Sequence, residues 1–223
     1  MCAEKACVKK PVSNNQITRA PSDSERKLLK VIFDSVIQSG RVPTPERISD
    51  ELKTSVDDVI HLLNGLESKD LLLRKEGTQK IISIYPFSMD ETHHQILLES
   101  GRRLFAMCAV DALGMPAMFN MDVGIISRCE KCKQEITIRI IDQEIASKSH
   151  PDIKIWRMSR EKPRSSAETC CPRINFFCSN KHVEQWKAEN PGLAGKGFVA
   201  SLELAFPKIK KQWKEYGESI GVR

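Results

Sequence analysis

The sequence predicts an α+β fold, in which a run of helices is followed by antiparallel strands rather than by alternating βαβ units. Apolar residues recur at helical spacing through residues 22–66. Two short apolar runs, at 71–75 and 81–85, are separated by the turn sequence Glu-Gly-Thr and indicate a hairpin. Residues 135–141 alternate in polarity and are rich in isoleucine, which is typical of a strand.

Each of the three expected helices has a recognisable start. The first begins at Ser22 or Asp23 and ends at Gly40. The second opens at Thr44-Pro45, because proline is well tolerated in a first turn, and the third is capped by Ser55.

Three helices and a hairpin make the winged-helix pattern, which we place at residues 22–86. Its third helix normally presents basic or amide side chains to DNA. Here that helix opens with Asp57 and Asp58 and carries Glu67, and carboxylates repel phosphates. We therefore expect a packing or lid module rather than a nucleic-acid reader.

The rest of the chain divides around this module. We expect residues 1–21 to form a disordered tail and residues 87–223 to form an α+β catalytic domain with antiparallel strands. Pro86 to Glu91 is interpreted as a linker, and His93 to Glu99 as a short helix.

Cysteine usage limits the function. The chain has 223 residues and a net charge of +6, with no apolar leader at its start. Its longest apolar stretch, Leu104 to Phe119, contains Asp111 and is too short to span a bilayer, so a cytosolic protein is expected. Thiols in a reducing compartment more often serve metals or catalysis than disulfides. The eight cysteines are Cys2, Cys7, Cys108, Cys129, Cys132, Cys170, Cys171 and Cys178.

Cys108 and Asp111 are the first candidate pair. They lie in an apolar segment that we interpret as a buried helix from Leu104 to Leu113, broken by Gly114 and Pro116, so that the two side chains share a face. Burial raises the pKa of a carboxyl, and a thiol that binds a metal must release a proton. The pair is thus a thiol beside a proton acceptor.

A second group has the spacing of zinc ligands. Cys129 and Cys132 form a Cys-x2-Cys pair, and Cys178 and His182 are four residues apart. A structural zinc site is one interpretation, but it would leave Cys108 and the Cys170-Cys171 pair unexplained.

Three stretches together resemble the alkylmercury lyase (organomercurial lyase) family. GRRLFAMCAVDALGMPAMF, from Gly101, resembles the catalytic segment of that family, and CCPRINFFCS, from Cys170, resembles its second cysteine motif. The run from Ser179 to Phe206 is similar to the family's C-terminal helix and strand. The resemblance extends over roughly residues 22–210.

The resemblance implies roles for individual residues. The family's first catalytic cysteine falls on Cys108, its aspartate on Asp111, and its second cysteine, five positions before the Phe-Phe pair, on Cys171, with Cys170 adjacent. An additional, non-catalytic family cysteine falls on Cys129. Two departures stand out: Met107 replaces an aromatic residue, and Cys132 and Cys178 are extra thiols.

The implied reaction is protonolysis of a carbon–mercury bond. Two thiolates, from Cys108 and Cys171, would bind the soft metal, and Asp111 would carry a proton from a thiol to the leaving carbon. The three groups serve as metal ligands and catalysts, and no cofactor is needed. The expected partners are an alkyl- or arylmercury substrate and a thiol acceptor for Hg(II), either a mercuric reductase or a small cytosolic thiol. No membrane partner is expected, and a monomer is favoured.

Two alternatives remain open. One is a DNA-binding metal sensor that combines the winged helix with a thiol effector domain. The other is a non-catalytic relative of the lyases that holds zinc through Cys129, Cys132, Cys178 and His182.

Overall fold

The computed structural model describes residues 20–158 and 165–222. The expected tail lies outside the described residues except for its last two positions. The helices are α1 (Asp23–Ser39), α2 (Pro45–Leu52), α3 (Val56–Ser68), α4 (Ala109–Phe119), α5 (Ser166–Thr169), α6 (Asn180–Glu189), α7 (Pro191–Ala194) and α8 (Leu202–Ile220), with one 3-10 turn, η1 (Cys171–Arg173).

The strands form two antiparallel sheets. In the larger sheet the order is β1 (Leu72–Arg74), β2 (Ile81–Ile84), β3 (Phe87–Ser88), β5 (Arg103–Ala106), β4 (Gln95–Leu98), β6 (Val123–Arg128), β7 (Glu135–Ile141) and β8 (Glu144–Lys148). In the smaller sheet β9 (Lys154–Met158) lies between β10 (Phe176–Phe177) and β11 (Gly197–Ser201). The α+β class with antiparallel strands is therefore confirmed.

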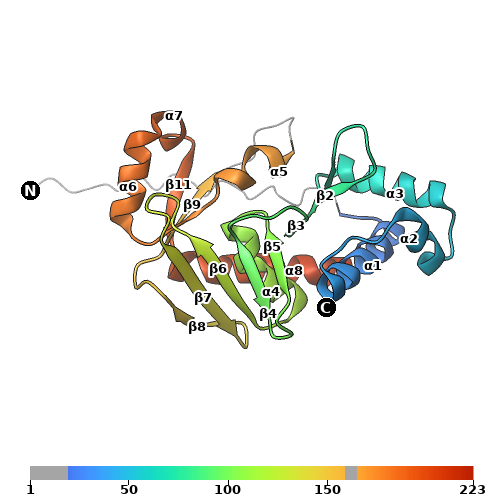
Figure 1. Ribbon diagram of the computed structural model, residues 1–223, viewed down its shortest axis with the longest axis horizontal. Helices are drawn as coiled ribbons and strands as arrows, with labels where there is room; N and C mark the ends of the chain where they lie inside the picture. Colours follow the sequence, from blue (N-terminus) through green and yellow to red (C-terminus); the bar gives the residue numbers. More distant parts are fainter. Residues whose placement is uncertain (1–19, 159–164, 223) are drawn as a thin grey trace, which may run out of the picture.

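Helices α1 to α3 begin where the sequence predicts, and α1 also ends where the sequence predicts. Ser22 and Ser55 are the N-caps of α1 and α3, and each takes part in a capping box. Thr44 caps α2, and Gly40 ends α1 in the left-handed conformation. The three helices lie together at one end of the molecule (Figure 1).

The large sheet continues from this helical end into the rest of the protein. Strand β2 pairs with β3, and β3 pairs with β5. One continuous sheet therefore contains strands from both sides of residue 86, where the predicted winged-helix segment ends. An aromatic cluster reinforces the junction: Phe33 of α1 lies 5.9 Å from Phe87 of β3 and 5.3 Å from Phe119 of α4, measured between ring centroids. The interpretation of Pro86 to Glu91 as a linker is wrong, because part of it is a paired strand.

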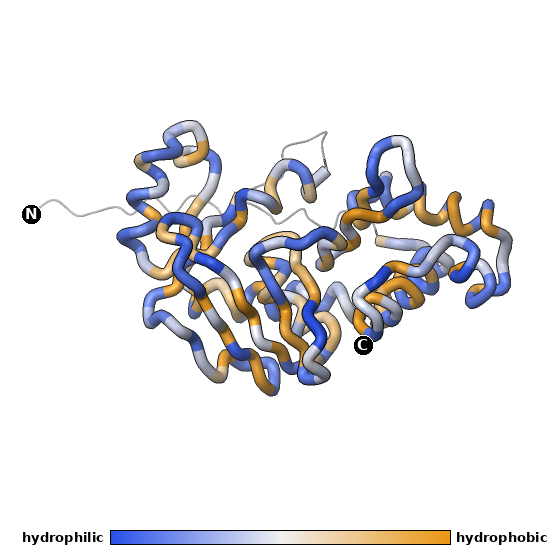
Figure 2. Tube along the Cα trace, in the orientation of Figure 1, coloured by the Kyte–Doolittle hydropathy of each residue, from blue (hydrophilic) through white to orange (hydrophobic). Residues whose placement is uncertain are grey.

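Helices α4 and α8 pack against one another and lie behind the large sheet in Figure 1. Residues 109–118 are buried on every face of α4. The two helices approach closely where Gly114 faces the Trp213 ring and Gly217 faces the backbone of Met118, since a Cβ at either glycine would collide with its neighbour. Figure 2 shows hydrophobic and hydrophilic residues alternating along the strands, as expected for a sheet with one covered face.

Two predicted elements are wrong. The expected helix at His93–Glu99 is replaced by β4, which pairs with β5 and β6. The expected helix at Leu104–Leu113 begins with a strand, β5, and the helix starts only at Ala109 and continues through Pro116 to Phe119. Short apolar runs fit a buried strand as well as a buried helix, and sheet pairing decided between them.

Among the described residues, no helix is both long enough and apolar enough to cross a membrane.

Candidate active site

Cys108 lies at the point where β5 passes into α4. It is the N-cap of α4, with extended backbone, and its Sγ accepts a hydrogen bond of 3.4 Å from the Asp111 amide. The expected shared helix face is therefore corrected: the two residues are neighbours because Cys108 caps the helix whose first turn contains Asp111. A helix N-terminus favours the thiolate form of a nearby cysteine.

Cys171 reaches this helix end from a distant part of the chain. It begins η1, which is separated from α5 by Cys170 alone. The Ala109 amide at the start of α4 donates a 3.0 Å hydrogen bond to the Ile174 carbonyl, just after η1. The ligand atoms of Cys108, Asp111 and Cys171 consequently lie within 4.8 Å of one another, and all three residues are buried.

Cys170 has different surroundings. Its Sγ lies 3.5 Å from the Ser166 carbonyl, inside the short helix α5. It is not in the group formed by Cys108, Asp111 and Cys171, although its thiol also interacts with that of Cys171. The Cys171 thiol instead lies 3.3 Å from the hydroxyl of Tyr85.

Burial governs the protonation of the group. It raises the pKa of Asp111 from 3.8 to about 7 and that of the Cys108 thiol to about 11. Hydrogen bonding to Cys108, together with burial, raises the pKa of Cys171 well above its ordinary value. One Asp111 oxygen, Oδ2, is buried with no hydrogen-bond partner among the described residues. The group therefore holds protonated thiols beside a carboxyl that exchanges its proton near neutral pH.

The segment that carries Cys171 is anchored to the helical end of the protein. Asp70, just after α3, accepts hydrogen bonds from the Ser166 amide, at 3.0 Å to Oδ1, and from the Ser166 hydroxyl, at 2.6 Å to Oδ2. A buried carboxylate that receives two donors holds its partners firmly. This anchor fixes the start of α5, four residues before Cys170.

Two histidines, His93 and His94, hold the segment that carries Cys171 at a point after this cysteine, through Asn175. The Oδ1 of Asn175 accepts hydrogen bonds from Nε2 of His93, at 2.9 Å, and of His94, at 3.2 Å. Burial lowers the pKa of His94 to about 3, so this ring is neutral, with its proton on Nε2 and its Nδ1 accepting from the Ser127 hydroxyl at 2.9 Å. Asn175 in turn donates to the Pro172 carbonyl at 3.3 Å and so orients the residue that follows Cys171.

A pocket of about 400 Å³ opens beside Cys171. Cys171 is in its wall, and Cys108 and Asp111 lie behind it, so a ligand that enters the pocket meets Cys171 first. Much of the wall is apolar, which suits a hydrocarbon substituent. Its apolar lining includes Leu73, Ile82, Met107, Ala167 and Pro172.

The structure thus brings together the three residues expected at the site and a second group, formed by Cys129, Cys132, Cys178 and His182. Sequence reasoning missed Tyr85, Asp70 and Asn175. Their residue types carry no signal of their own, because each has a partner at the site that lies 81 to 96 residues away in the sequence. Pairing of β2 with β3 and packing of α5 are what create these contacts.

Comparison with known proteins gives a consistent result. The family model described as alkylmercury lyase matches residues 87–215, more than half of the chain. The alkylmercury lyase of Bacillus cereus is 25% identical over 211 residues, covering 91% of this chain and 92% of that protein. That of Staphylococcus epidermidis is 22% identical over 210 residues, covering 94% and 88%. A crystal structure of the mercury-bound form of MerB2 superposes with a TM-score of 0.75 at 26% identity, covering 91% of this chain and 95% of the other. The chain therefore belongs to the alkylmercury lyase family.

Proposed function

We propose that this protein cleaves the carbon–mercury bond of alkyl- and arylmercury cations, with Cys108 and Cys171 as thiolate ligands and Asp111 as the proton carrier. The observation that supports this assignment is the convergence of two buried thiols and one buried carboxyl, whose ligand atoms lie within 4.8 Å. Mercury prefers thiolates to oxygen or nitrogen ligands, as soft metals do, so two adjacent thiols form a strong site for it.

The reaction is balanced without any other reagent. The substrate R–Hg⁺ and two thiols give R–H, mercury held by two thiolates, and one released proton. The electron pair of the carbon–mercury bond remains on the carbon and forms the new C–H bond, while mercury stays divalent. No oxidant, reductant or cofactor is required.

Asp111 is suited to moving the proton. Its pKa of about 7 lets the ionised carboxyl accept a proton from a thiol when mercury binds, and then give it to the carbon. The pKa values of the thiols are raised by burial and by their mutual contact, so metal binding has to displace their protons. The Asp111 carboxyl lies close to both sulfurs and can accept one of these protons.

The pocket beside Cys171 is the proposed entrance for the substrate. Its apolar wall would receive the organic group, while mercury would pass to Cys171 and then to Cys108. We expect organomercurials as a class to be substrates.

Release of the product requires another thiol, because two thiolates hold Hg(II) too firmly for transfer to water. A mercuric reductase or a small cytosolic thiol is the proposed acceptor. We accordingly place the protein in the cytosol, where thiols stay reduced, and the six described cysteines are all free thiols. We propose a monomer, since all three reacting groups come from one chain.

We propose that residues 22–86 are a winged-helix-like module that serves the site instead of DNA. This segment supplies Tyr85 and Asp70, which contact Cys171 and the helix before it. Its hairpin contributes Leu73 and Ile82 to the pocket wall. Glu67 of α3 forms an ion pair with Arg74 of β1, so the Arg74 guanidinium is bound to a carboxylate and is not free to bind a DNA phosphate.

The direct test is hydrocarbon release from phenylmercury or methylmercury in the presence of excess thiol. The intact protein should release benzene or methane, and Cys108→Ser should release none while keeping its fold. His61→Ala, which changes an exposed histidine on α3, is the matched control and should retain full activity. Hydrocarbon release that persists in Cys108→Ser would overturn the assignment.

A further inference from the structure

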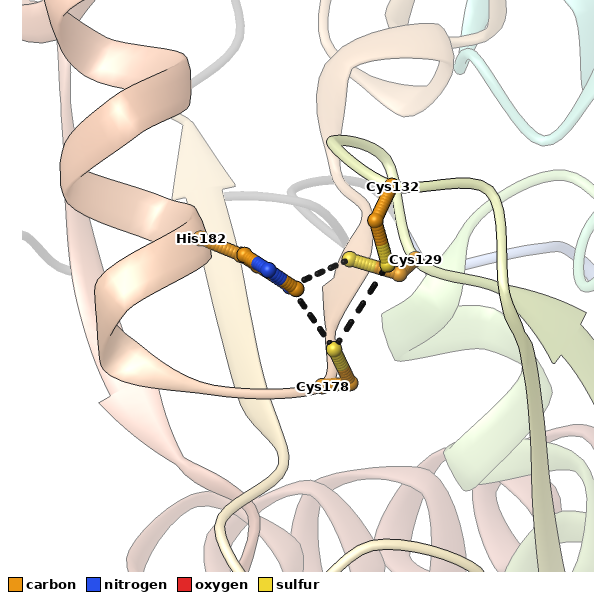
Figure 3. A group of neighbouring side chains, drawn as sticks. All are labelled: Cys129, Cys132, Cys178 and His182. Carbon is orange, nitrogen blue, oxygen red and sulfur yellow. Dashed lines mark hydrogen bonds between the residues drawn. The ribbon is translucent and has the colours of Figure 1, made fainter.

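Besides the candidate active site, the described residues contain a second cluster of thiols. It comprises Cys129 and Cys132, in the turn between β6 and β7, and Cys178 and His182, at the start of α6 (Figure 3). The four ligand atoms lie within 4.8 Å of one another, although the two pairs are separated by more than forty residues of sequence.

We propose that this cluster is a structural zinc site with three thiolate ligands and one histidine. The residues and their Cys-x2-Cys and Cys-x3-His spacings are those that tetrahedral Zn²⁺ takes in structural sites. The site is additional to the mercury chemistry and does not depend on it.

The separations between the ligand atoms fit a tetrahedral metal. With Zn–S bonds of about 2.3 Å and a Zn–N bond of about 2.0 Å, two sulfurs lie about 3.8 Å apart and a sulfur lies about 3.5 Å from the nitrogen. Cys132 Sγ lies 3.7 Å from Cys178 Sγ, and Cys129 Sγ lies 3.7 Å from His182 Nδ1. Cys178 Sγ is 2.8 Å from the same nitrogen, so that separation would lengthen by about 0.7 Å on binding.

The backbone around the cluster is built as a ligand turn. The Cys129 amide donates to the Gln134 carbonyl at 2.8 Å, and the Lys133 amide donates to the Cys129 carbonyl at 2.9 Å. Lys133 adopts the left-handed conformation, with φ of 60°, which closes the turn directly after Cys132. Both thiols of the turn therefore point to the same side, toward the start of α6.

The N-terminal end of α6 supplies the other two ligands. Cys178 precedes the N-cap Ser179, and His182 lies in the first turn with Nδ1 directed at the sulfurs (Figure 3). The partial positive charge at this helix end favours thiolates beside it. Four protein ligands fill a tetrahedral shell and leave no position for water or substrate, which indicates a structural role.

Two alternatives fit the geometry less well. A disulfide has sulfurs about 2.05 Å apart, whereas the Sγ atoms of Cys132 and Cys178 are 3.7 Å apart and all three cysteines of the cluster are free thiols. A hydrogen-bonded thiol cluster without metal would gather three ionisable sulfurs around one point, and the single imidazole of His182 could balance the charge of only one thiolate.

The zinc would support the segment that carries Cys171. The Glu130 amide, inside the Cys-x2-Cys turn, donates to the Phe176 carbonyl of β10 at 2.9 Å. Strand β10 lies between Cys171 and Cys178 in the sequence. A metal that joins the β6–β7 turn to α6 would therefore hold β10 from both sides.

The test is the metal content of the purified full-length protein. We expect about one zinc per chain in the wild type and in Cys108→Ser. Zinc affinity should fall by at least roughly a hundredfold in Cys132→Ser and His182→Ala, because each removes one of the four ligands. His61→Ala is the matched control for the histidine and should keep its zinc. Since Cys108→Ser should lose hydrocarbon release and retain zinc, failure of this proposal is distinguishable from failure of the proposed catalytic function.

A second measurement covers variants that fail to fold. Replacing zinc by Co²⁺ in the wild-type protein should give the visible absorption of tetrahedral cobalt bound to thiolates, and removing the metal should lower the melting temperature. A folded wild type that neither contains zinc nor gives this cobalt spectrum would overturn the proposal. Zinc that stays equally tight in both Cys132→Ser and His182→Ala would overturn it as well.

Discussion

The hydroxyl of Tyr85 lies 3.3 Å from the sulfur of Cys171, although 86 residues separate them in the sequence. Burial raises the pKa of Tyr85 well above its ordinary value, so the phenol stays neutral and can donate to a thiolate. The contact joins the end of the N-terminal hairpin to the thiol in the wall of the pocket.

Tyr85→Phe should slow protonolysis roughly tenfold without unfolding the protein. It removes one hydrogen bond to a charged sulfur, for which about 1.5 kcal/mol is typical. The thiolate of Cys171 should also form at higher pH, which the pH dependence of its alkylation measures. Tyr216→Phe is the matched control, because the Tyr216 hydroxyl is buried with no hydrogen-bond partner in the described structure. An equal loss of protonolysis rate in Tyr85→Phe and Tyr216→Phe would contradict a role for the Tyr85 hydroxyl.

Asp111→Asn should stabilise the folded protein at neutral and alkaline pH. Folding raises the pKa of Asp111 from 3.8 to about 7, so the folded state disfavours the ionised form. Well below pH 3.8 the Asp111 carboxyl is neutral in both the folded and the unfolded state, so its ionisation does not change the free energy of unfolding. As pH rises toward 7, the unfolded chain ionises first and the wild type loses folding stability, by on the order of 4 kcal/mol in full. Urea unfolding of both proteins at acidic and alkaline pH tests this, and a stability difference that does not change with pH would contradict it.

The rate of a single turnover should rise with pH through about 7. The ionised carboxyl of Asp111 is the form that accepts a thiol proton, and its pKa is about 7. The measurement uses excess protein over phenylmercury and no added thiol, so that product release does not contribute. Asp111→Asn should be far slower and lack this rise. A wild-type rate that falls as pH increases through neutrality would mean that the protonated carboxyl is the active form.

Gly114→Ala should destabilise the protein by about 1–3 kcal/mol, because a Cβ at this position collides with the ring of Trp213 and forces α4 away from α8. Gly192→Ala is the control: its Cβ would meet nothing within 4 Å, and its stability should change little. Since α4 begins beside Cys108, Gly114→Ala should also reduce turnover. Equal melting temperatures for the two variants would contradict the close helix packing.

The fold was predictable where local signals were strong. The caps at Ser22, Thr44 and Ser55 fixed the starts of α1 to α3, because each serine or threonine satisfies amides that the helix leaves free. The isoleucine alternation of 135–141 likewise predicted β7. Strands β4 and β5 were missed, since their short apolar runs fit a helix as well as a strand, and pairing with each other and with β3 and β6 decides their identity.

The candidate site was predictable in its residues and not in its geometry. Cys108 and Asp111 were identified as a pair, but as members of one helix face, whereas Cys108 caps the helix. Cys171 could be named only by the family resemblance, and nothing in its neighbourhood distinguishes it from Cys170. The two thiols interact with each other, but Cys171 at the start of η1 also lies in the group with Cys108 and Asp111, whereas the Cys170 sulfur also contacts the Ser166 carbonyl.

The most direct test of the proposed chemistry compares Cys171→Ser with Cys170→Ser in a single turnover of phenylmercury, with benzene release as the measurement and the melting temperature as the check of folding. The two thiols are adjacent and buried, so the substitutions are matched in size and setting. Cys170→Ser should release benzene at a rate within about threefold of the wild type, and Cys171→Ser should release none. Benzene release by folded Cys171→Ser at the wild-type rate would contradict the assignment of Cys171 as the second thiolate.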